Sequence, residues 1–222
     1  MATKSVLILL LVTVATTVAQ KKCCYPSQFE GSLGSITAQV QAGQGTTQTD
    51  GLQYAYDFTN GRVGAITSKD DMGVMTKYQY IYDFSKKRQY NIQVSPDISV
   101  CISGPLNGTV PHCVPASATY LGSSYYGDHK LTVDFFQYFE SMGPSNYANV
   151  TMTVSQGDCV PFSVVTEGMN NAVPTLGIHG YVNYTSGISD PSKYFAVPSF
   201  CAQQSNHKTP KMPKLLFDKI LP

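Results

Sequence analysis

The sequence Lys77-Tyr78-Gln79-Tyr80-Ile81-Tyr82-Asp83-Phe84 has the most regular alternation in this 222-residue chain. Successive side chains of a β-strand point to opposite faces, so the four aromatic residues of this segment share one face. Aromatic residues also favour strands over helices. A basic turn, Ser85-Lys86-Lys87, separates it from a second strand-like segment, residues 88–94. The pattern therefore predicts a half-buried strand that pairs with its successor in a hairpin.

A similar pattern occurs about 26 residues upstream. Residues 52–58 read Leu-Gln-Tyr-Ala-Tyr-Asp-Phe, and Asn60-Gly61, the strongest short hairpin signal, follows them. Residues 131–140 fit both helical and strand periodicity, and Thr132 and Val133 favour a strand there. Nothing from Leu33 to Thr185 looks strongly helical. The sequence therefore predicts an all-β, mainly antiparallel protein of roughly ten strands.

Two polar segments that contain glycine are expected to interrupt the strands. Residues 41–51 predict a loop or the end of a hairpin, and residues 168–177 predict a loop with room for a short helix. Near the start of the mature chain, Glu30 and Gly31 are expected to turn the chain after a buried Phe29.

The first residues have the features of a secretory signal peptide. Lys4 supplies a positive charge, residues 6–14 are apolar, and Thr17 and Ala19 are small residues that suit cleavage after Ala19. Residues 1–19 are therefore predicted to be removed, and a buried N-terminal helix is the weaker alternative. No second apolar run reaches the roughly 20 residues that a membrane span needs. We expect a soluble, secreted, extracellular protein.

The mature chain is formally neutral. The full chain has 15 Lys and Arg, and removal of Lys4 leaves 14 of them against 14 Asp and Glu. A neutral chain disfavours a nucleic-acid partner, which selects for a basic stripe. It also disfavours a highly acidic, mineral-binding polyelectrolyte. About 200 residues fit one large all-β domain.

Six cysteines follow the signal peptide, and an even number in a secreted chain implies disulfide bonds. Zinc binding has no support, because the cysteines and histidines lack the usual ligand spacing. Six cysteines allow 15 pairings, and spacing alone does not choose among them. Cys23 and Cys24 are adjacent, so we expect them to have different partners.

Three glycosylation sequons are present, at Asn107, Asn149 and Asn183. Around the second sequon, Val150, Met152 and Val154 alternate with polar residues. This alternation places Asn149 on the solvent face of a predicted strand, where a glycan has room.

The residues give little support for catalysis. The four histidines are scattered, and no Gly-x-Ser-x-Gly motif occurs. Cysteines in disulfides leave no thiol nucleophile. Asp70-Asp71 could contact calcium, but an EF-hand loop needs further ligands at fixed offsets, so a solvated turn is the better interpretation. We predict a protein that is not an enzyme and has no resident cofactor.

Aromatic density is the feature that indicates binding, because the chain has 15 Tyr and 10 Phe. Buried tyrosines give an apolar wall whose hydroxyls need partners, which suits an amphipathic ligand such as a lipid. The alternative is an ordinary core between two layers. The candidate pocket residues are Tyr54, Tyr56, Phe58, Tyr78, Tyr80, Tyr82 and Phe84.

The segment Gly187-Ile-Ser-Asp-Pro-Ser-Lys-Tyr-Phe-Ala-Val-Pro-Ser-Phe-Cys201 predicts a terminal clasp. Asp190-Pro191 starts a turn, so we interpret Asp190 as a turn-former and not as a catalytic acid. The aromatic residues that follow need a core, and Cys201 can attach the segment covalently to a distant strand. Residues 202–222 form a basic C-terminal tail: either a disordered segment, which is favoured, or a docking segment for an acidic partner or membrane surface.

Together these motifs resemble the ependymin family, and the invertebrate ependymin-related proteins most. The resemblance rests on Cys-Cys-x-Pro-x-x-Phe-Glu-Gly at residues 23–31, Tyr-x-Tyr-Asp-Phe at 54–58, Tyr-Asp-Phe at 82–84, Cys-Val-Pro at 159–161 and the clasp. It covers residues 20–201, which we take as one ependymin-like domain. Phe29 stands where the family commonly has Trp.

The resemblance implies two curved antiparallel sheets in a half-open barrel, with a hydrophobic pocket and one or two short helices. It implies the disulfide pairs Cys23–Cys159 and Cys101–Cys201, and with them Cys24–Cys113. Family members are secreted glycoproteins, often dimeric, that are linked to extracellular matrix, cell adhesion, calcium and lipid binding, with no established enzyme activity.

Two functional hypotheses follow. In the first, the protein is a secreted carrier or sensor that binds an amphipathic lipid through the candidate pocket residues. In the second, it is a structural or adhesive extracellular glycoprotein of shell or matrix whose association depends on calcium and glycans.

Overall fold

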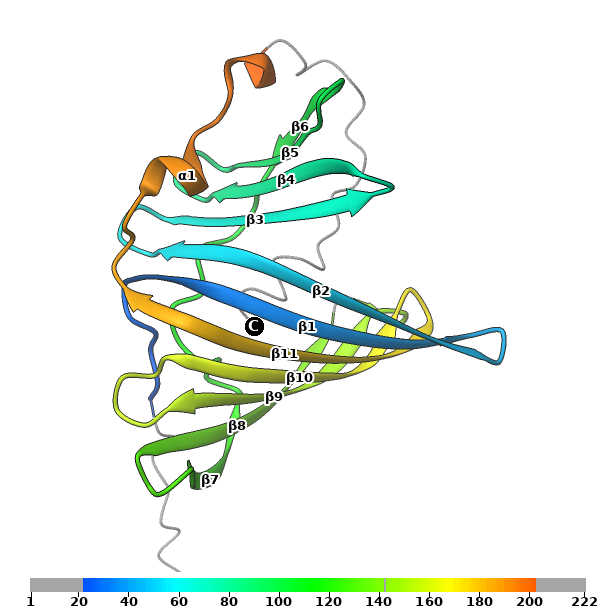
Figure 1. The fold of residues 1–222 in the computed structure, drawn as a ribbon. Helices are drawn as coiled ribbons and strands as arrows, with labels where there is room; N and C mark the ends of the chain where they lie inside the picture. The colour runs from blue at the N-terminus through cyan, green and yellow to red at the C-terminus, as the bar shows by residue number, and fades with distance from the viewer. Residues whose placement is uncertain (1–21, 142, 203–222) are drawn as a thin grey trace, which may run out of the picture.

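The computed structural model describes residues 22–141 and 143–202 of the chain (Figure 1). Within these residues, eleven strands form one antiparallel sheet in the order β6-β5-β4-β3-β2-β1-β11-β10-β9-β8-β7. The strands are β1 (Gln28–Gln41), β2 (Gln44–Asp57), β3 (Arg62–Asp71), β4 (Val74–Asp83), β5 (Arg88–Val94), β6 (Ser99–Pro105), β7 (Thr119–Tyr126), β8 (Leu131–Ser141), β9 (Tyr147–Ser155), β10 (Pro161–Asn170) and β11 (Val173–Ser186). The helix α1 (Pro191–Phe195) and the 3₁₀ turn η1 (Ser199–Ala202) follow. The predicted all-β, mainly antiparallel class is confirmed, whereas the predicted signal peptide and most of the basic tail lie outside the described residues.

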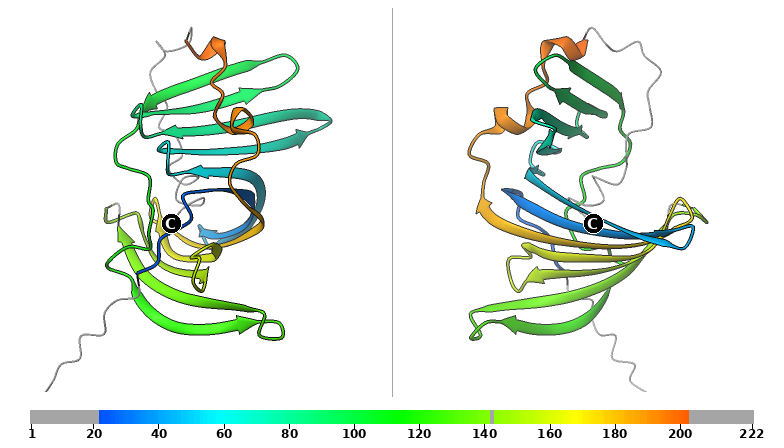
Figure 2. Two further views of the ribbon diagram at one scale, coloured as in Figure 1. Left: turned by 90° about the vertical axis from the view of Figure 1, so that its left-hand side faces the viewer. Right: turned by 45° about the vertical axis from the view of Figure 1, so that its right-hand side comes forward.

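The sheet is strongly curved, so that its two arms face one another across a concave side (Figures 1 and 2). One arm runs from β2 to β6, the other from β11 to β7, and β1 joins them at the centre. The two curved layers expected from the family resemblance are therefore arms of one continuous hydrogen-bonded sheet. The sheet does not close, because β6 and β7 are its two edges.

Three local expectations differ from the structure. The polar segment 41–51 is mostly strand, because β1 and β2 pair from Gln28↔Asp57 to Gln41↔Gln44 and turn at residues 42–43. Residues 168–177 are also a hairpin, which turns at residues 171–172. The chain does not turn at Glu30 and Gly31, which lie inside β1. In each case the strands stay paired through residues that do not alternate between apolar and polar side chains. Pairing between strands uses only backbone N–H and C=O groups, so it does not require that alternation.

The concave side holds the main hydrophobic core. Phe29 and Leu33 on β1 pack with Tyr54 and Tyr56 on β2, and the other arm contributes Phe136. The N-terminal segment and the loop between β6 and β7 also enter this cluster, through buried side chains such as Cys23, Tyr25, Val110 and Val114. The centre of the concave side is therefore filled by protein.

All six cysteines lie in the described residues and form three disulfide bonds, Cys23–Cys159, Cys24–Cys113 and Cys101–Cys201. These are the pairs that the family resemblance implies. The first two bonds attach the N-terminal segment to the connection between β9 and β10 and to the loop that leads to β7. The third attaches η1 to β6.

Residues 187–201, the clasp, cover the outer face of the arm formed by β2 to β6 (Figure 1). Asp190 is the N-cap of α1, because its carboxylate accepts hydrogen bonds from the backbone N–H groups of Ser192 and Lys193 at 3.0 and 3.2 Å. Tyr194 and Phe195 bury their rings against a second cluster on this face. Under the helix, the Gln79 side-chain amide donates to the Tyr194 carbonyl oxygen at 3.0 Å.

Candidate ligand-binding face

Six of the seven candidate pocket residues, all except Phe58, lie on one surface, the concave face of β2 to β4. Tyr54, Tyr56 and Tyr82 are members of the main core, and Tyr80 and Phe84 are half-buried and pack against it. They share the face because β2 and β4 both pair with β3, which places Tyr54 and Tyr80 on either side of Ala65. The alternation of the sequence thus predicts which side chains lie together. That these residues line a pocket stays a prediction.

Tyr54 and Tyr56 are packed core residues with partners of their own. Tyr56 is 0% exposed, and its hydroxyl donates to the Pro111 carbonyl oxygen at 2.8 Å. Its ring makes an edge contact with Tyr25, at 6.3 Å between ring centroids. Tyr54 makes a similar contact with Tyr181 at 5.8 Å. These rings form the floor of the concave face, and a ligand would have to lie beyond them.

Phe58 is separated from the other candidates. It follows the last residue of β2 and is 40% exposed. Its ring stacks on His112, with 3.8 Å between centroids, and so covers the loop between β6 and β7. Burial and the charge of Lys22 lower the pKa of His112, so the imidazole that meets Phe58 is neutral at pH 7.

Tyr78 and Tyr80 continue the aromatic row of β4 away from the core. Both are half-buried, whereas Tyr82 in the same row is buried. Asp50 on β2 and Lys69 on β3 lie on the same face further along, and the Lys69 Nζ atom is 3.7 Å from an Asp50 carboxylate oxygen. We call Tyr78, Tyr80, Asp50 and Lys69 the rim. The concave face therefore changes from packed apolar rings to half-exposed phenols and then to a charged pair.

Three tyrosines of this face, Tyr54, Tyr56 and Tyr80, have a raised pKa and stay neutral over the physiological pH range. Burial raises the pKa of Tyr54 and Tyr56, and neighbouring Tyr184 and Tyr194 raise the pKa of Tyr54 further. Burial, Tyr78 and Asp50 raise the pKa of Tyr80. The phenols are thus hydrogen-bonding groups without charge, which suits a wall for an amphipathic ligand.

Sequence reasoning missed the contribution of the other arm. Tyr181 on β11, Phe136 and Tyr138 on β8 and Met152 on β9 belong to the same core as Tyr54. Their strands alternate, which signals buried faces, but nothing in the sequence says that those faces meet the face of β2. Only the curvature of the sheet brings the two arms together (Figure 2).

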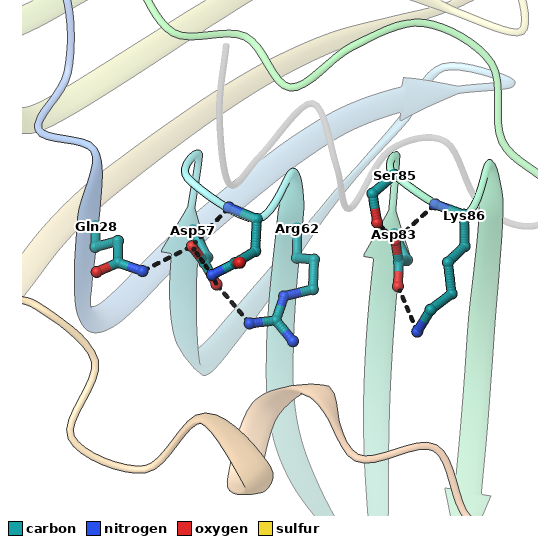
Figure 3. Close-up of polar contacts among 7 residues, drawn as sticks. Gln28, Asp57, Arg62, Asp83, Ser85 and Lys86 are labelled. Atoms are coloured by element: carbon teal, nitrogen blue, oxygen red, sulfur yellow. Dashed lines mark hydrogen bonds and ion pairs between the residues drawn. The ribbon is translucent and has the colours of Figure 1, made fainter.

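Two aspartates, Asp57 and Asp83, occupy equivalent places in the β2–β3 and β4–β5 hairpins (Figure 3). Each accepts a hydrogen bond from the backbone N–H three residues later, Asn60 at 3.1 Å and Lys86 at 2.9 Å. Asp57 also accepts from the Gln28 side chain at 2.8 Å and from the Arg62 guanidinium at 2.6 Å. Asp57 and Asp83 therefore have structural roles in the hairpin turns and are not candidates for acid–base chemistry.

The hydrogen bonds outweigh burial in both carboxylates. Burial alone would raise the pKa of Asp57, but the bonds from Gln28, Arg62 and Asn60 hold it below its usual value. The same balance, with Ser85 and Lys86 as donors, lowers the pKa of Asp83.

The described residues contain no group of three or more His, Cys, Asp or Glu side chains that could hold a metal ion. Asp70, which the sequence offers as a calcium contact, accepts a hydrogen bond from the backbone N–H of Gly73 at 2.8 Å and closes a turn. In the same part of the chain, no helix has the length and apolarity that a membrane crossing requires.

Comparison with known proteins places the chain in a family. Ependymin-related protein 2 of Haliotis asinina is 29% identical over 204 residues, which cover 88% of this chain and 97% of that protein. Ependymin-related protein 1 of the same animal is 29% identical over 197 residues, with coverage of 84% and 93%. Among solved structures, a LolA superfamily protein from Nitrosomonas europaea aligns with 77% of this chain and 91% of its own, at 11% identity. The two structures superpose with a TM-score of 0.36.

The family profile named Ependymin matches residues 74–201, from the first residue of β4 to the last cysteine of the clasp. This match spans more than half of the chain and includes β4 with its aromatic row, the second aspartate hairpin and the Cys101–Cys201 bond. The chain therefore belongs to the ependymin family.

Proposed function

We propose that this protein is a secreted, disulfide-bonded glycoprotein that binds an amphipathic lipid at the rim of its concave face. The observation that carries this proposal is the decrease in side-chain burial along β4. Tyr82 is buried in the core, Tyr80 and Tyr78 are half-buried, and the Asp50–Lys69 pair follows on the neighbouring strands. An acyl chain would lie against the rings, and its polar head would meet the charged pair.

The charges at the rim favour an anionic head group. Lys69 is more than half exposed, with 56% of its side chain accessible, so it can turn from Asp50 towards a carboxylate or phosphate at little cost. The phenol hydroxyls of Tyr78 and Tyr80 can donate hydrogen bonds to the same head group. A lipid with one acyl chain and an anionic head is the ligand class that this arrangement fits best.

Secretion and glycosylation are parts of the same proposal. Disulfide bonds persist in oxidising compartments, and all six cysteines of the chain are in disulfides. The three sequon asparagines, Asn107, Asn149 and Asn183, are all exposed. These features support export through an oxidising, glycosylating pathway.

The binding test uses the full chain secreted from cultured animal cells. The protein is delipidated and titrated with cis-parinaric acid, a fatty acid whose fluorescence rises when it leaves water. We expect saturable binding. Tyr80→Ala should weaken it about tenfold or more, because it removes an aromatic side chain worth about 1.5–3 kcal/mol of apolar contact. Lys69→Ala should weaken binding of the fatty acid a few-fold and leave binding of a long-chain alcohol unchanged.

Tyr125→Ala is the matched control, because Tyr125 is an exposed tyrosine on the edge strand β7. It should bind like the wild type. Absence of saturable binding by the delipidated protein would end the proposal. Calcium-dependent self-association in its place would favour the structural or adhesive glycoprotein.

A further inference from the structure

The outer face of β1 and β11 carries exposed apolar side chains where the clasp does not reach. They belong to adjacent strands, since Ile36 pairs with Ile178 and Ala38 pairs with Leu176. Val165 on β10 pairs with Ile178 and extends the apolar surface. We call this surface the bare outer face. Its large exposed members, Ile36, Leu176, Ile178 and Val182, are between 41% and 54% exposed.

A contiguous apolar surface of this kind needs an explanation in a secreted protein, because such patches promote association. At one end it runs into a groove of about 530 Å³. The groove is lined by Val40, Tyr147, Met169 and Leu176 among others, and the sequon residue Asn149 is part of its wall. Asn149 is exposed, whereas the next residue, Val150, is 1% exposed and faces the core.

The register of the sheet places Asn149 in line with the bare outer face. Asn149 pairs with Glu167 on β10, Glu167 pairs with Leu176 on β11, and Leu176 pairs with Ala38 on β1. Leu176 is thus two strand spacings from Asn149, or about 10 Å. The first few sugars of an N-linked glycan span such a distance.

We propose that the N-linked glycan on Asn149 lies in this groove and covers the bare outer face. The proposal rests on the glycosylation that forms part of the proposed function. It assigns to one sequon a specific role, which is to shield a sheet face that the polypeptide leaves uncovered.

The groove and the residues beside it have the chemistry that sugars bind. Phe139 lies directly opposite Asn149 on β8, and its ring contacts that of Tyr147 at 5.9 Å between centroids. Tyr147 is two residues before Asn149 and therefore on the same face. Sugar rings have C–H faces that pack on aromatic rings, whose π faces are electron-rich. The exposed carboxylate of Glu167, next to Asn149, can accept hydrogen bonds from sugar hydroxyls.

The other sequons lack this setting. Asn107 lies in the loop after β6, outside the strands. Asn183 lies near the end of β11 with a φ of 55°, a conformation that asparagine tolerates better than most residues. Neither residue is part of the groove wall. Asn107 therefore provides the control.

The test compares three secreted variants with the wild type. Glycopeptide mass spectrometry first measures occupancy at Asn149. We expect Asn149→Gln to raise the fluorescence of the hydrophobic dye ANS several-fold and to cause concentration-dependent self-association in sedimentation velocity. Asn107→Gln should change neither property. Thr151→Ser, which keeps the sequon, should behave like the wild type.

A second substitution tests the location. Ile178→Lys places a charge on the exposed outer face, so the double variant Asn149→Gln/Ile178→Lys should return to the monomer. An unoccupied Asn149 in the wild-type glycoprotein overturns the proposal. Full occupancy with no change in dye binding or sedimentation after Asn149→Gln overturns it as well.

Cis-parinaric acid binding by Asn149→Gln separates this inference from the lipid proposal. The rim lies on the concave face, so we expect the binding constant to stay within two-fold of the wild type. Loss of shielding with intact fatty-acid binding supports the role of the glycan. Fatty-acid binding that fell tenfold with the glycan would contradict its placement on the outer face.

Discussion

The outer face of the sheet is covered over one arm and bare over its centre. Over β3, helix α1 comes so close that a Cβ atom at Gly64 would lie 2.8 Å from the Tyr194 carbonyl oxygen. At Gly34 on β1 and Gly180 on β11, a Cβ atom would have no described neighbour within 4 Å. The Cβ atoms added at these three glycines would all lie on the outer side of the same sheet. Alternation within a strand therefore does not determine whether its second face is buried, because that depends on a segment far away in the sequence.

The largest effect is expected when the clasp is released from the outer face that it covers. Cys201→Ser removes a bond between residues 100 apart in sequence, which in the chain-entropy model contributes about 4–5 kcal/mol to the free energy of unfolding. We expect greatly reduced secretion and, for the protein that is recovered, a lower urea midpoint. The double variant Cys101→Ser/Cys201→Ser separates loss of the bond from the effect of a free thiol. Normal secretion of both variants would show that the clasp does not stabilise the fold.

The next test removes the apolar anchor of the clasp. Phe195 is 9% exposed, and the Arg62 guanidinium lies over its ring at 4.3 Å. Phe195→Ala should reduce the free energy of unfolding by about 3 kcal/mol, because it leaves a cavity and removes a cation–π contact. Ile178→Ala on the bare outer face should cost less than about 1 kcal/mol. Equal losses in urea unfolding would mean that both regions are covered to the same extent.

Glycine-to-alanine substitutions compare the two regions with one added methyl group. Gly64→Ala should destabilise the fold by about 1–3 kcal/mol, because α1 has to move away from the new Cβ atom. Gly34→Ala should be neutral or stabilising by up to about 1 kcal/mol, since alanine restricts the unfolded chain and meets no atom in the fold. Thermal unfolding of both variants measures the difference. Destabilisation at Gly34 would show that another element covers that site.

The smallest expected difference is between substitutions of the two hairpin aspartates, Asp57 and Asp83. Asp57→Asn should reduce the free energy of unfolding by about 1–2 kcal/mol near pH 7, because it removes the charged acceptor of Arg62. The Arg62 guanidinium in turn lies over the Phe195 ring of the clasp. Asp83→Asn should cost less than about 1 kcal/mol, since its ion-pair partner, Lys86, is 71% exposed.

The dependence on pH tests the cause of these losses. Both carboxylates have a lowered pKa in the fold, so they stabilise it above the unfolded pKa of about 4, and this contribution is lost as pH falls through the folded pKa. The difference between wild type and Asp57→Asn in urea unfolding should therefore shrink between about pH 5 and pH 2. If the difference in free energy of unfolding did not change with pH, the loss in Asp57→Asn would result from packing and not from the charge.

Strands and turns with a strong local signal could be predicted from the sequence. The alternation around Tyr80 and the Asn60-Gly61 turn gave β4 and the hairpin of β2 and β3 at their observed places. The long hairpins at residues 42–43 and 171–172 could not be predicted, because polar residues there pair only through their backbones. For the candidate site, the periodicity placed Tyr54 and Tyr80 on one face. It also placed Phe58 there, but Phe58 follows the end of β2 and its ring stacks on His112 of the loop between β6 and β7.

The class of fold, the positions of most strands along the chain and the set of aromatic residues that share a face follow from the amino-acid pattern. These features depend on interactions between residues close in sequence, or on the two-residue repeat of a strand. Three features appear only in the three-dimensional structure: the two arms are one sheet, Tyr54 and Tyr56 form its packed floor, and the clasp covers Gly64 but not Gly34. These features depend on contacts between segments that are distant in sequence. The curvature of the sheet and the disulfide bonds create those contacts, and the local periodicity of the sequence does not predict them.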